Sequence, residues 1–448
     1  MIELSPTIIM TIMFSGLLLL TFIGYPLAFA IAVTGIGVGM LTLEIPALFN
    51  LIYYQMFNIL HSYILLALPL FIFMGSMLAR SGLGDRMYAA LYVFLSGLRG
   101  GLAIVTVLVG TVLAACVGVM SASVAMLTLV ALPAMITRGY DKSLAAGVCS
   151  GAGCLGTLIP PSIMLVIYGP MAGVSVGKLF MGAFMPGLVL SAFYCLYIFF
   201  RCLFRPELGP PVPAEERAIP LTKKISMLLI SLIPPAFIVL SVLGVIFLGI
   251  APPTEAAAMG CLAATLLVIA FRKFSWQVTK ETAIETLTIT ARAMLISGTS
   301  IAFTAVFITL GCGKVVEQLL LQAPFGRWGA FAVVQFLYFI LGFFIDWIGI
   351  FFIMVPILAP IAPLLGFDPL WFGLIICINL QTSYQTPPFA PGVYYVRGCS
   401  PPEWGMTMPI IIRGCAPYVG LILAGLALCI VFPEIVLWLP SMMTVVGR

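Results

Sequence analysis

The sequence predicts an all-helical protein that crosses a membrane many times and contains two inverted repeats, each with a re-entrant hairpin and a broken helix. Three observations predict this fold class: an apolar composition, hydrophobic runs of helix length, and an internal repeat. Of the 448 residues, 62% are hydrophobic and 8% are charged, whereas about 25% of the residues of a soluble protein are charged. A soluble core cannot hide that much apolar surface, so lipid must surround the helices.

Hydrophobic runs recur along the chain at close to the ~20 residues that cross a bilayer as a helix. They lie at 7–24, 26–43, 62–80, 183–204, 225–250, 254–271, 294–311 and 410–433. The first run has no basic residue before it and no small-residue cleavage site after it. We therefore interpret it as a retained span rather than a signal peptide.

The internal repeat relates landmarks that lie 227 residues apart. The matched pairs are Pro26 and Pro253, Pro133 and Pro360, Gly139-Tyr140-Asp141 and Gly366-Phe367-Asp368, and Pro160-Pro161 and Pro387-Pro388. A polar, proline-rich stretch at 206–224 separates the halves and is expected to be a cytoplasmic linker. The expected organisation is thus a first repeat at 1–205 and a second at 225–448, which is typical of transporters.

Two apolar regions, at 100–137 and 328–365, are each about twice as long as one span. Their centres, Gly118–Ser123 and Asp346–Gly349, are polar and contain glycine. Such a region fits either two full spans or a re-entrant hairpin. The hairpin is favoured because neither centre has the long hydrated loop that is usual at a membrane surface.

Each hairpin region precedes a helix, at 142–169 and 369–397, that consecutive prolines interrupt at Pro160-Pro161 and Pro387-Pro388. Two adjacent prolines remove two N–H donors and free backbone carbonyls at mid-membrane depth. Lipid cannot satisfy these carbonyls, so such breaks are tolerated only against protein or a water-filled cavity. Merely kinked helices that pack together are the alternative.

The distribution of basic residues predicts the orientation. If the hairpins enter from opposite faces, the segments near 80–99, 138–142, 201–224, 272–292 and 397–413 share one face and hold sixteen of the 20 Lys and Arg residues. Because basic residues accumulate on the cytoplasmic side, this face is expected to be cytoplasmic. Both termini are then periplasmic.

Asp346 is the most informative single residue, because it is the only charged residue between Arg327 and Asp368. Carboxylates inside a membrane usually face a partner or a coupling ion; a turn between two full spans is the alternative. Oxygen donors suit a small hard cation such as sodium. We expect Ser121, Ser123, Gly156 and Pro161 to form one sodium site, and Asp346 with Thr386 to form the other.

Polar side chains at the two breaks are the candidate substrate ligands. They are Thr157, Ser162, Asn379, Gln381, Thr382, Ser383 and Gln385. Such groups could bind an anion with help from helix N-termini, or some of them only cap the broken helix ends. No Lys or Arg lies between Arg292 and Lys314, so the span at 294–311 is expected to offer no cation at mid-membrane depth.

Other function classes find little support in the residues. The single histidine, His61, and the lack of an H-E-x-x-H motif leave little material for an enzyme, and no phosphate loop of a pump occurs. The basic residues form no stripe for nucleic acid, and the cysteines are expected to be buried apolar residues, without metal or cofactor. A channel would not need two broken helices, although composition alone does not exclude one.

Three stretches resemble the hallmark sequences of the large membrane subunit of tripartite ATP-independent periplasmic (TRAP) transporters. They are GTLIPPSI at 156–163, APPTEAAAMG at 251–260 and QTPPFAPG at 385–392. The resemblance runs from the first span to the last. It implies an elevator-type sodium symporter of the bacterial inner membrane that imports a small organic acid. A two-hairpin anion symporter that works without a binding protein is the alternative.

The resemblance also implies partners and site residues. The partners are a small membrane subunit and a periplasmic substrate-binding protein, and the interfacial segments Ile45–Leu60 and Trp276–Leu287 would brace the moving domain against the small subunit. One sodium site would use Gly156, Ile159 and Pro161 beside the first hairpin tip, and the other would use Asp346, Thr386 and Phe389. The chain departs from the family pattern at Ser123 and Ala125, and it lacks an arginine where sialic-acid members hold the substrate carboxylate, which leaves the substrate open.

Overall fold

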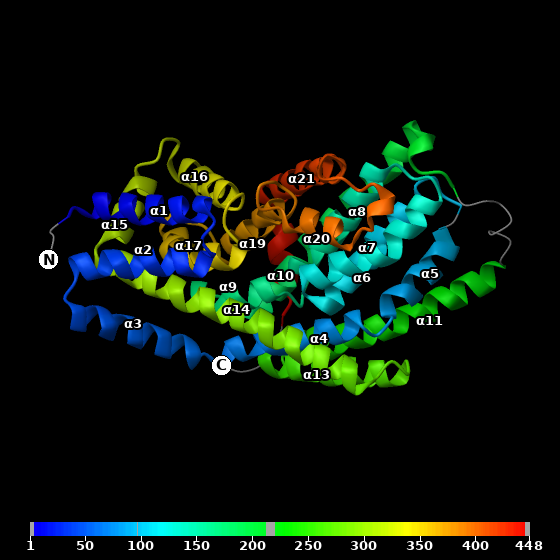
Figure 1. The fold of residues 1–448 in the computed structure, drawn as a ribbon, viewed down its shortest axis with the longest axis horizontal. Coiled ribbons are helices and arrows are strands. Elements are labelled where there is room, and N and C mark those ends of the chain that lie inside the picture. The colour runs from blue at the N-terminus through cyan, green and yellow to red at the C-terminus, as the bar shows by residue number, and fades with distance from the viewer. Residues whose placement is uncertain (1–3, 96, 212–219, 444–448) are drawn as a thin grey trace.

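The computed structural model describes residues 4–95, 97–211 and 220–443, and its regular secondary structure in these ranges is helical (Figure 1). Within them, seven helices are long and apolar enough to cross a membrane, and one bent helix pair would make an eighth. The prediction of an all-helical, multi-span membrane protein is therefore confirmed.

The described residues of the first half form ten α-helices and short 3-10 turns. In order they are α1 (Pro6–Ile23), α2 (Leu27–Thr42), α3 (Ile45–Leu60), α4 (Ala67–Ala79), α5 (Leu83–Leu95), α6 (Gly101–Val117), α7 (Met120–Thr137), α8 (Lys142–Cys154), α9 (Ile163–Ala172) and α10 (Val176–Phe204). The pair α6 and α7 occupies the first hairpin region. Helices α8 and α9 are the two parts of the first broken helix.

The second half repeats much of this order. Its α-helices are α11 (Leu221–Val239), α12 (Val245–Phe247), α13 (Pro253–Ala270), α14 (Trp276–Thr309), α15 (Cys312–Leu321), α16 (Gly326–Leu341), α17 (Trp347–Leu358), α18 (Ile361–Leu364), α19 (Pro369–Leu380), α20 (Pro391–Cys399), α21 (Met408–Val431) and α22 (Glu434–Ser441). Shifted by 227 residues, α2 falls on α13, α8 on α19 and α9 on α20.

The repeated landmarks perform the same local tasks in both halves. Gly139 and Gly366 take left-handed φ angles of 74° and 75° before the two broken helices. Asp141 then caps α8 by accepting from the N–H of Leu144, and Asp368 caps α19 by accepting from the N–H of Trp371. A left-handed glycine ends one element and an Asp cap starts the next. The matched Gly and Asp residues therefore start the matched helices α8 and α19.

The two halves differ where the first is bent and the second is continuous. Helices α3 and α4 meet at an angle of 54°, whereas the matching stretch of the second half is the single 34-residue helix α14. The expectation of an interfacial segment at 276–287 followed by a separate span at 294–311 was therefore wrong. No Gly or Pro interrupts the chain between Trp276 and Ser297, so nothing ends the helix there.

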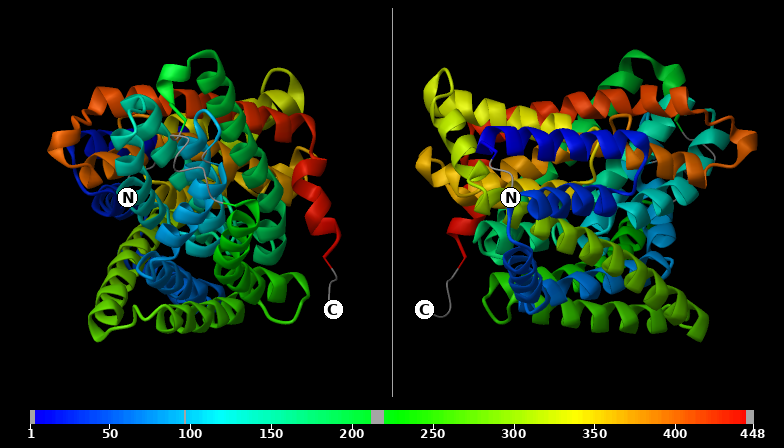
Figure 2. Two further views of the ribbon diagram at one scale, coloured as in Figure 1. Left: turned by 90° about the vertical axis from the view of Figure 1, so that its right-hand side faces the viewer. Right: turned by 60° about the vertical axis from the view of Figure 1, so that its left-hand side comes forward.

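Helices α3, α4, α11 and α13 lie along one side of the molecule, and α8, α16, α20 and α21 lie along the other, in both Figure 1 and Figure 2. On the first side, Arg80 at the end of α4 pairs with Glu285 of α14 at 2.6 Å. On the second side, α8 and α21 pack closely, because a Cβ added to Gly147 would lie only 2.1 Å from the Gly414 carbonyl oxygen. Helix α14 runs between the two groups, where it packs against α2, α4 and α17.

Candidate functional site

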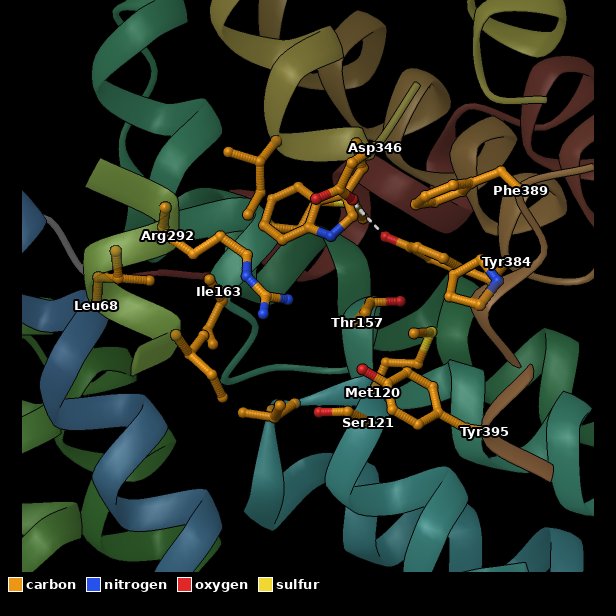
Figure 3. Close-up of a pocket in the computed structure, with 18 residues that line it drawn as sticks. Leu68, Met120, Ser121, Thr157, Ile163, Arg292, Asp346, Tyr384, Phe389 and Tyr395 are labelled. Atoms are coloured by element: carbon orange, nitrogen blue, oxygen red, sulfur yellow. Dashed lines mark hydrogen bonds between the residues drawn. The ribbon is translucent and has the colours of Figure 1, made fainter. Parts of the chain in front are cut away.

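A cavity of about 310 Å³ lies where the two hairpin tips and the two broken helices meet α14 (Figure 3). The first hairpin contributes Gly118–Ser121 and the second contributes Asp346–Ile348. The cavity thus draws on both halves of the chain. Segments more than 220 residues apart in sequence form one site.

Each hairpin tip rests on the break of its own half. A Cβ added to Gly118, which has a φ of 64°, would lie 2.3 Å from the Pro161 carbonyl oxygen, so only glycine fits there. In the second half, the N–H of Phe389 donates to the Phe343 carbonyl at 3.1 Å, and a Cβ added to Gly342 would lie 2.8 Å from Ser383 Cβ. The tips and the breaks therefore form one packed unit in each half.

Four helices point their N-termini at the cavity. The first residues of α7, α9, α17 and α20, namely Met120, Ile163, Trp347 and Pro391, all line it. Helix N-termini carry unpaired N–H groups and a partial positive charge, which favour anions. The backbone alone therefore makes this cavity suited to a negatively charged solute.

Asp346 lines the cavity at the N-cap position of α17. Its carboxylate makes no capping hydrogen bond of standard geometry, although the N–H groups of Trp347 and Ile348 and the Arg292 guanidinium act on it electrostatically. A carboxylate in a cavity with largely apolar walls is costly unless donors or a cation join it. Asp346 is thus the anionic group of the cavity wall.

Arg292 enters the same cavity from α14, and its side chain points into the open space in Figure 3. It lies near the middle of the 34-residue helix rather than at one of its ends. In the part of the chain that the structure describes, Arg80 makes the two ion pairs within 4.0 Å. Arg292 and Asp346 therefore face each other across the cavity without direct contact.

A sequence signal for Arg292 existed in the uninterrupted helical stretch around it. Ile289, Arg292 and Ala293 lie on one helical face at spacings of three and four residues, and all three line the cavity. The distribution of basic residues instead groups Arg292 with the cytoplasmic ends near 272–292, because the apolar run begins at residue 294.

The first sodium candidate has an unsatisfied hydroxyl at its centre. Ser123 is 0% exposed and its Oγ has no hydrogen-bond partner. A Cβ added to Gly156 would lie 3.1 Å from this oxygen, and Ser121 lines the cavity beside it. A buried hydroxyl without a partner costs about 1–3 kcal/mol, so a bound ion at this point would relieve a penalty.

Ile159, a further residue of the first sodium candidate, packs its side chain against Gly187, since a Cβ added to that glycine would meet Ile159 Cγ1 at 2.4 Å.

In the second candidate site, Asp346 and Phe389 line the cavity together. Thr386 is half-buried outside the cavity wall and donates its hydroxyl to the Thr382 carbonyl at 2.7 Å. Its hydroxyl oxygen keeps lone pairs that can still coordinate a cation.

Of the seven substrate candidates, Thr157 lines the cavity. Its hydroxyl donates to the Cys154 carbonyl and contacts Gln381 Oε1 at 2.9 Å, which joins the two broken helices. The other six are buried outside the cavity wall: Ser162, Asn379, Gln381, Thr382, Ser383 and Gln385. Ser162, Thr382 and Ser383 donate to backbone carbonyls of their own break, as expected of groups that cap helix ends.

Both charges of the cavity come from the second half of the chain. The residue 227 positions before Arg292 is Leu65, and the residue 227 positions before Asp346 is Val119. Both equivalents are buried and apolar. The repeat therefore gives the site its shape, and the second half gives it its charge.

A known family of membrane transporters matches most of the chain. Residues 14–435 match the family model of the tripartite ATP-independent periplasmic transporter, DctM component. The chain belongs to the DctM family. The resemblance stated from sequence is confirmed, and DctM proteins are transporter components rather than enzymes.

Among similar DctM proteins is the C4-dicarboxylate TRAP transporter large permease of Pseudomonas aeruginosa, with 30% identity over 86% of this chain and 88% of that protein. The ectoine/5-hydroxyectoine TRAP transporter large permease of Ruegeria pomeroyi is also 30% identical, over 84% of this chain and 85% of that protein. The crystal structure of the Alcanivorax borkumensis YdaH transporter has a TM-score of 0.60 and 14% identity, and covers 95% of this chain and 99% of that one. The DctM chain thus shares its fold with a solved transporter.

Proposed function

We propose that this DctM protein is the sodium-coupled permease of a TRAP system and imports a small organic acid across the bacterial inner membrane. The observation that carries the proposal is the single cavity shared by two hairpin tips, two broken helices and one intramembrane carboxylate. Four helix N-termini favour an anion, and a volume of about 310 Å³ lies at the low end of the roughly 300–1,000 Å³ of ligand pockets. Both features suit a small acid.

The coupling ions have two places in this proposal. One sodium ion binds among Ser121, Ser123, Gly156, Ile159 and Pro161, and the unpartnered Ser123 hydroxyl supports that assignment. The other binds among Asp346, Thr386 and Phe389, where a carboxylate oxygen is free of the helix cap. These sites need only oxygen ligands, and no organic cofactor enters the cycle.

Transport follows an elevator mechanism in this proposal, with the two halves inverted relative to each other. The hairpins and broken helices move as one body against a scaffold that includes α1 and α14. An apolar cavity of about 440 Å³ between α1, α15, α16 and α17 supports this division. A boundary of apolar side chains has few hydrogen bonds to break when the two bodies slide.

The permease acts with a periplasmic substrate-binding protein and a small membrane subunit. The subunit binds along α3 and the first half of α14, which pack together and expose Tyr53, Phe57, Ile284 and Leu287. Exposed apolar patches of this kind mark contact with protein or membrane. Lipid covers the remaining outer surface, and both termini lie in the periplasm.

The test is uptake into proteoliposomes that contain this chain and its small subunit, with the labelled acid that co-purifies with the binding protein. Saturable uptake that requires both a sodium gradient and the binding protein is the expected result. Equal uptake without the binding protein would favour the independent two-hairpin symporter. Uptake that neither saturates nor needs sodium would identify a channel.

A further inference from the structure

The cavity wall contains one basic and one acidic side chain among the residues that the structure describes, and they come from different bodies. Arg292 belongs to α14, which packs against α2 and α4, whereas Asp346 stands at the tip of the second hairpin. The two lie more than 4.0 Å apart, yet they interact electrostatically. The cavity wall thus holds two side chains of opposite charge that form no ion pair.

We propose that Arg292 binds the carboxylate or sulfonate head of the transported solute, and that sodium at Asp346 makes this binding possible by removing the arginine's counter-charge. The inference rests on the proposed transport function and adds to it a cause for the coupling. In this proposal Arg292 contacts the substrate, and Asp346 controls whether Arg292 is free to bind it.

Arg292 is exposed and Asp346 is half-buried, and both line the cavity together with Trp347, Phe389 and Met164. Apolar walls of this kind solvate a charge less well than open water does, so a charge without a counter-charge is disfavoured there. A solute anion that binds Arg292 alone leaves Asp346 unpaired, and a sodium ion that binds Asp346 alone leaves Arg292 unpaired. Together they satisfy both groups.

The free energy of each binding event therefore depends on the other, and the dependence is reciprocal. Sodium raises the affinity for the anion by the same factor by which the anion raises the affinity for sodium. Neutralising either side chain must abolish this coupling. Loss of the Arg292 charge should strengthen sodium binding and weaken anion binding, whereas loss of the Asp346 charge should weaken sodium binding and strengthen anion binding. A role in packing alone would not produce opposite signs.

Sodium binding is measured first, with no solute present. The purified complex with the small subunit is titrated with sodium chloride at constant ionic strength, with choline as the replacement cation, and the melting temperature is recorded. Arg292→Gln removes a positive charge that opposes the cation, so the sodium concentration for the half-maximal shift should fall roughly tenfold. Arg292→Lys keeps the charge and should resemble the unsubstituted protein.

Anion binding is measured next, with butyrate and ethanesulfonate as carboxylate and sulfonate probes. The unsubstituted protein should gain stability from at least one probe in sodium and from neither in choline. Arg292→Gln should lose the response in both salts. Asp346→Asn should retain the response in choline as well, because Arg292 is then permanently without a counter-charge.

Lys280→Gln is the matched control, because it removes a positive charge from an exposed position of the same helix, outside the cavity. It should leave both titrations unchanged. A sodium affinity unaltered by Arg292→Gln, or no response of the unsubstituted protein to either probe in sodium, would overturn the inference. Absence of any sodium response in the unsubstituted protein would instead contradict the proposed sodium coupling itself.

Discussion

Two prolines leave carbonyl oxygens that distant side chains satisfy. Pro356 has no N–H, so the Phe352 carbonyl in α17 lacks its helical partner, and Thr304 of α14 donates to it at 3.1 Å. Pro433 frees the Cys429 carbonyl in the same way, and Trp371 Nε1 donates to it at 3.1 Å. Because Thr304 lies on the proposed scaffold and Phe352 on the proposed moving hairpin, the first bond crosses the boundary between them.

Thr304→Val keeps the shape of the side chain and removes this bond. We expect a loss of roughly 1–2 kcal/mol of stability, because the buried Phe352 carbonyl is left without a donor. Thermal unfolding of the purified protein measures it. Thr299→Val is the control, because Thr299 bonds only carbonyls of its own helix; equal stability of the two variants would show that the cross-boundary bond contributes nothing.

Ser123→Ala tests the first sodium site. Removing an unpartnered buried hydroxyl should leave the sodium-free protein as stable as before or more so, while the stabilisation by sodium should decrease. The readout is the melting temperature with and without sodium. Ser300→Ala removes another buried, unpartnered hydroxyl and should preserve the sodium response; an unchanged response in Ser123→Ala would remove this residue from the ion site.

At the scale of elements, sequence patterns predicted what local chemistry dictates. The broken helices follow from Pro160-Pro161 and Pro387-Pro388, because proline cannot continue a helix without loss. Helix α14 was divided wrongly, because a hydropathy window stops at Arg292 although nothing in the backbone does. Helices α5 and α15 were missed, since their apolar residues alternate with charged and polar ones and cover only one face.

The contact of the first hairpin tip with its break is testable with a pair of glycines. Gly118→Ala and Gly139→Ala both place a side chain at a left-handed φ, which costs about 1 kcal/mol. Only Gly118 also meets a backbone oxygen at 2.3 Å, whereas nothing lies within 4 Å of a Cβ on Gly139. Unfolding measurements should show the larger loss for Gly118→Ala, together with reduced uptake; equal losses would mean that the tip does not press on the break.

At the scale of the whole molecule, the 227-residue repeat predicted which segments would share the site, but not which side chains would line it. Ser121, Thr157 and Asp346 lie in the cavity wall, while Thr382 and Ser383 of the second break donate to their own backbone. Side-chain direction at a break depends on tertiary packing rather than on local periodicity. Arg292 was missed for a different reason: hydropathy excluded it from the apolar run, although its helical spacing from Ile289 and Ala293 places all three on the face that lines the cavity.

The proposed subunit contact belongs to this scale as well. Tyr53→Ala with Phe57→Ala should weaken co-purification of the small membrane subunit at least tenfold, because aromatic side chains supply a large share of interface energy. Pull-down from detergent extracts gives the measurement. Phe204→Ala removes an even more exposed aromatic residue, from α10, and should have no effect; full retention of the subunit by the double variant would place its contact elsewhere.

Because both cavity charges belong to one half of the chain, the proposed transport cycle is expected to be asymmetric. If the inverted halves exchange conformations during the cycle, the outward-facing and inward-facing states are not equivalent. The positions that correspond to Arg292 and Asp346 in the first half are Leu65 and Val119, which carry no charge. The solute would then contact the Arg292 guanidinium in one state and aliphatic side chains in the other. Half-saturation constants measured in right-side-out and inside-out vesicles should therefore differ, and the ratio should approach one in Arg292→Gln.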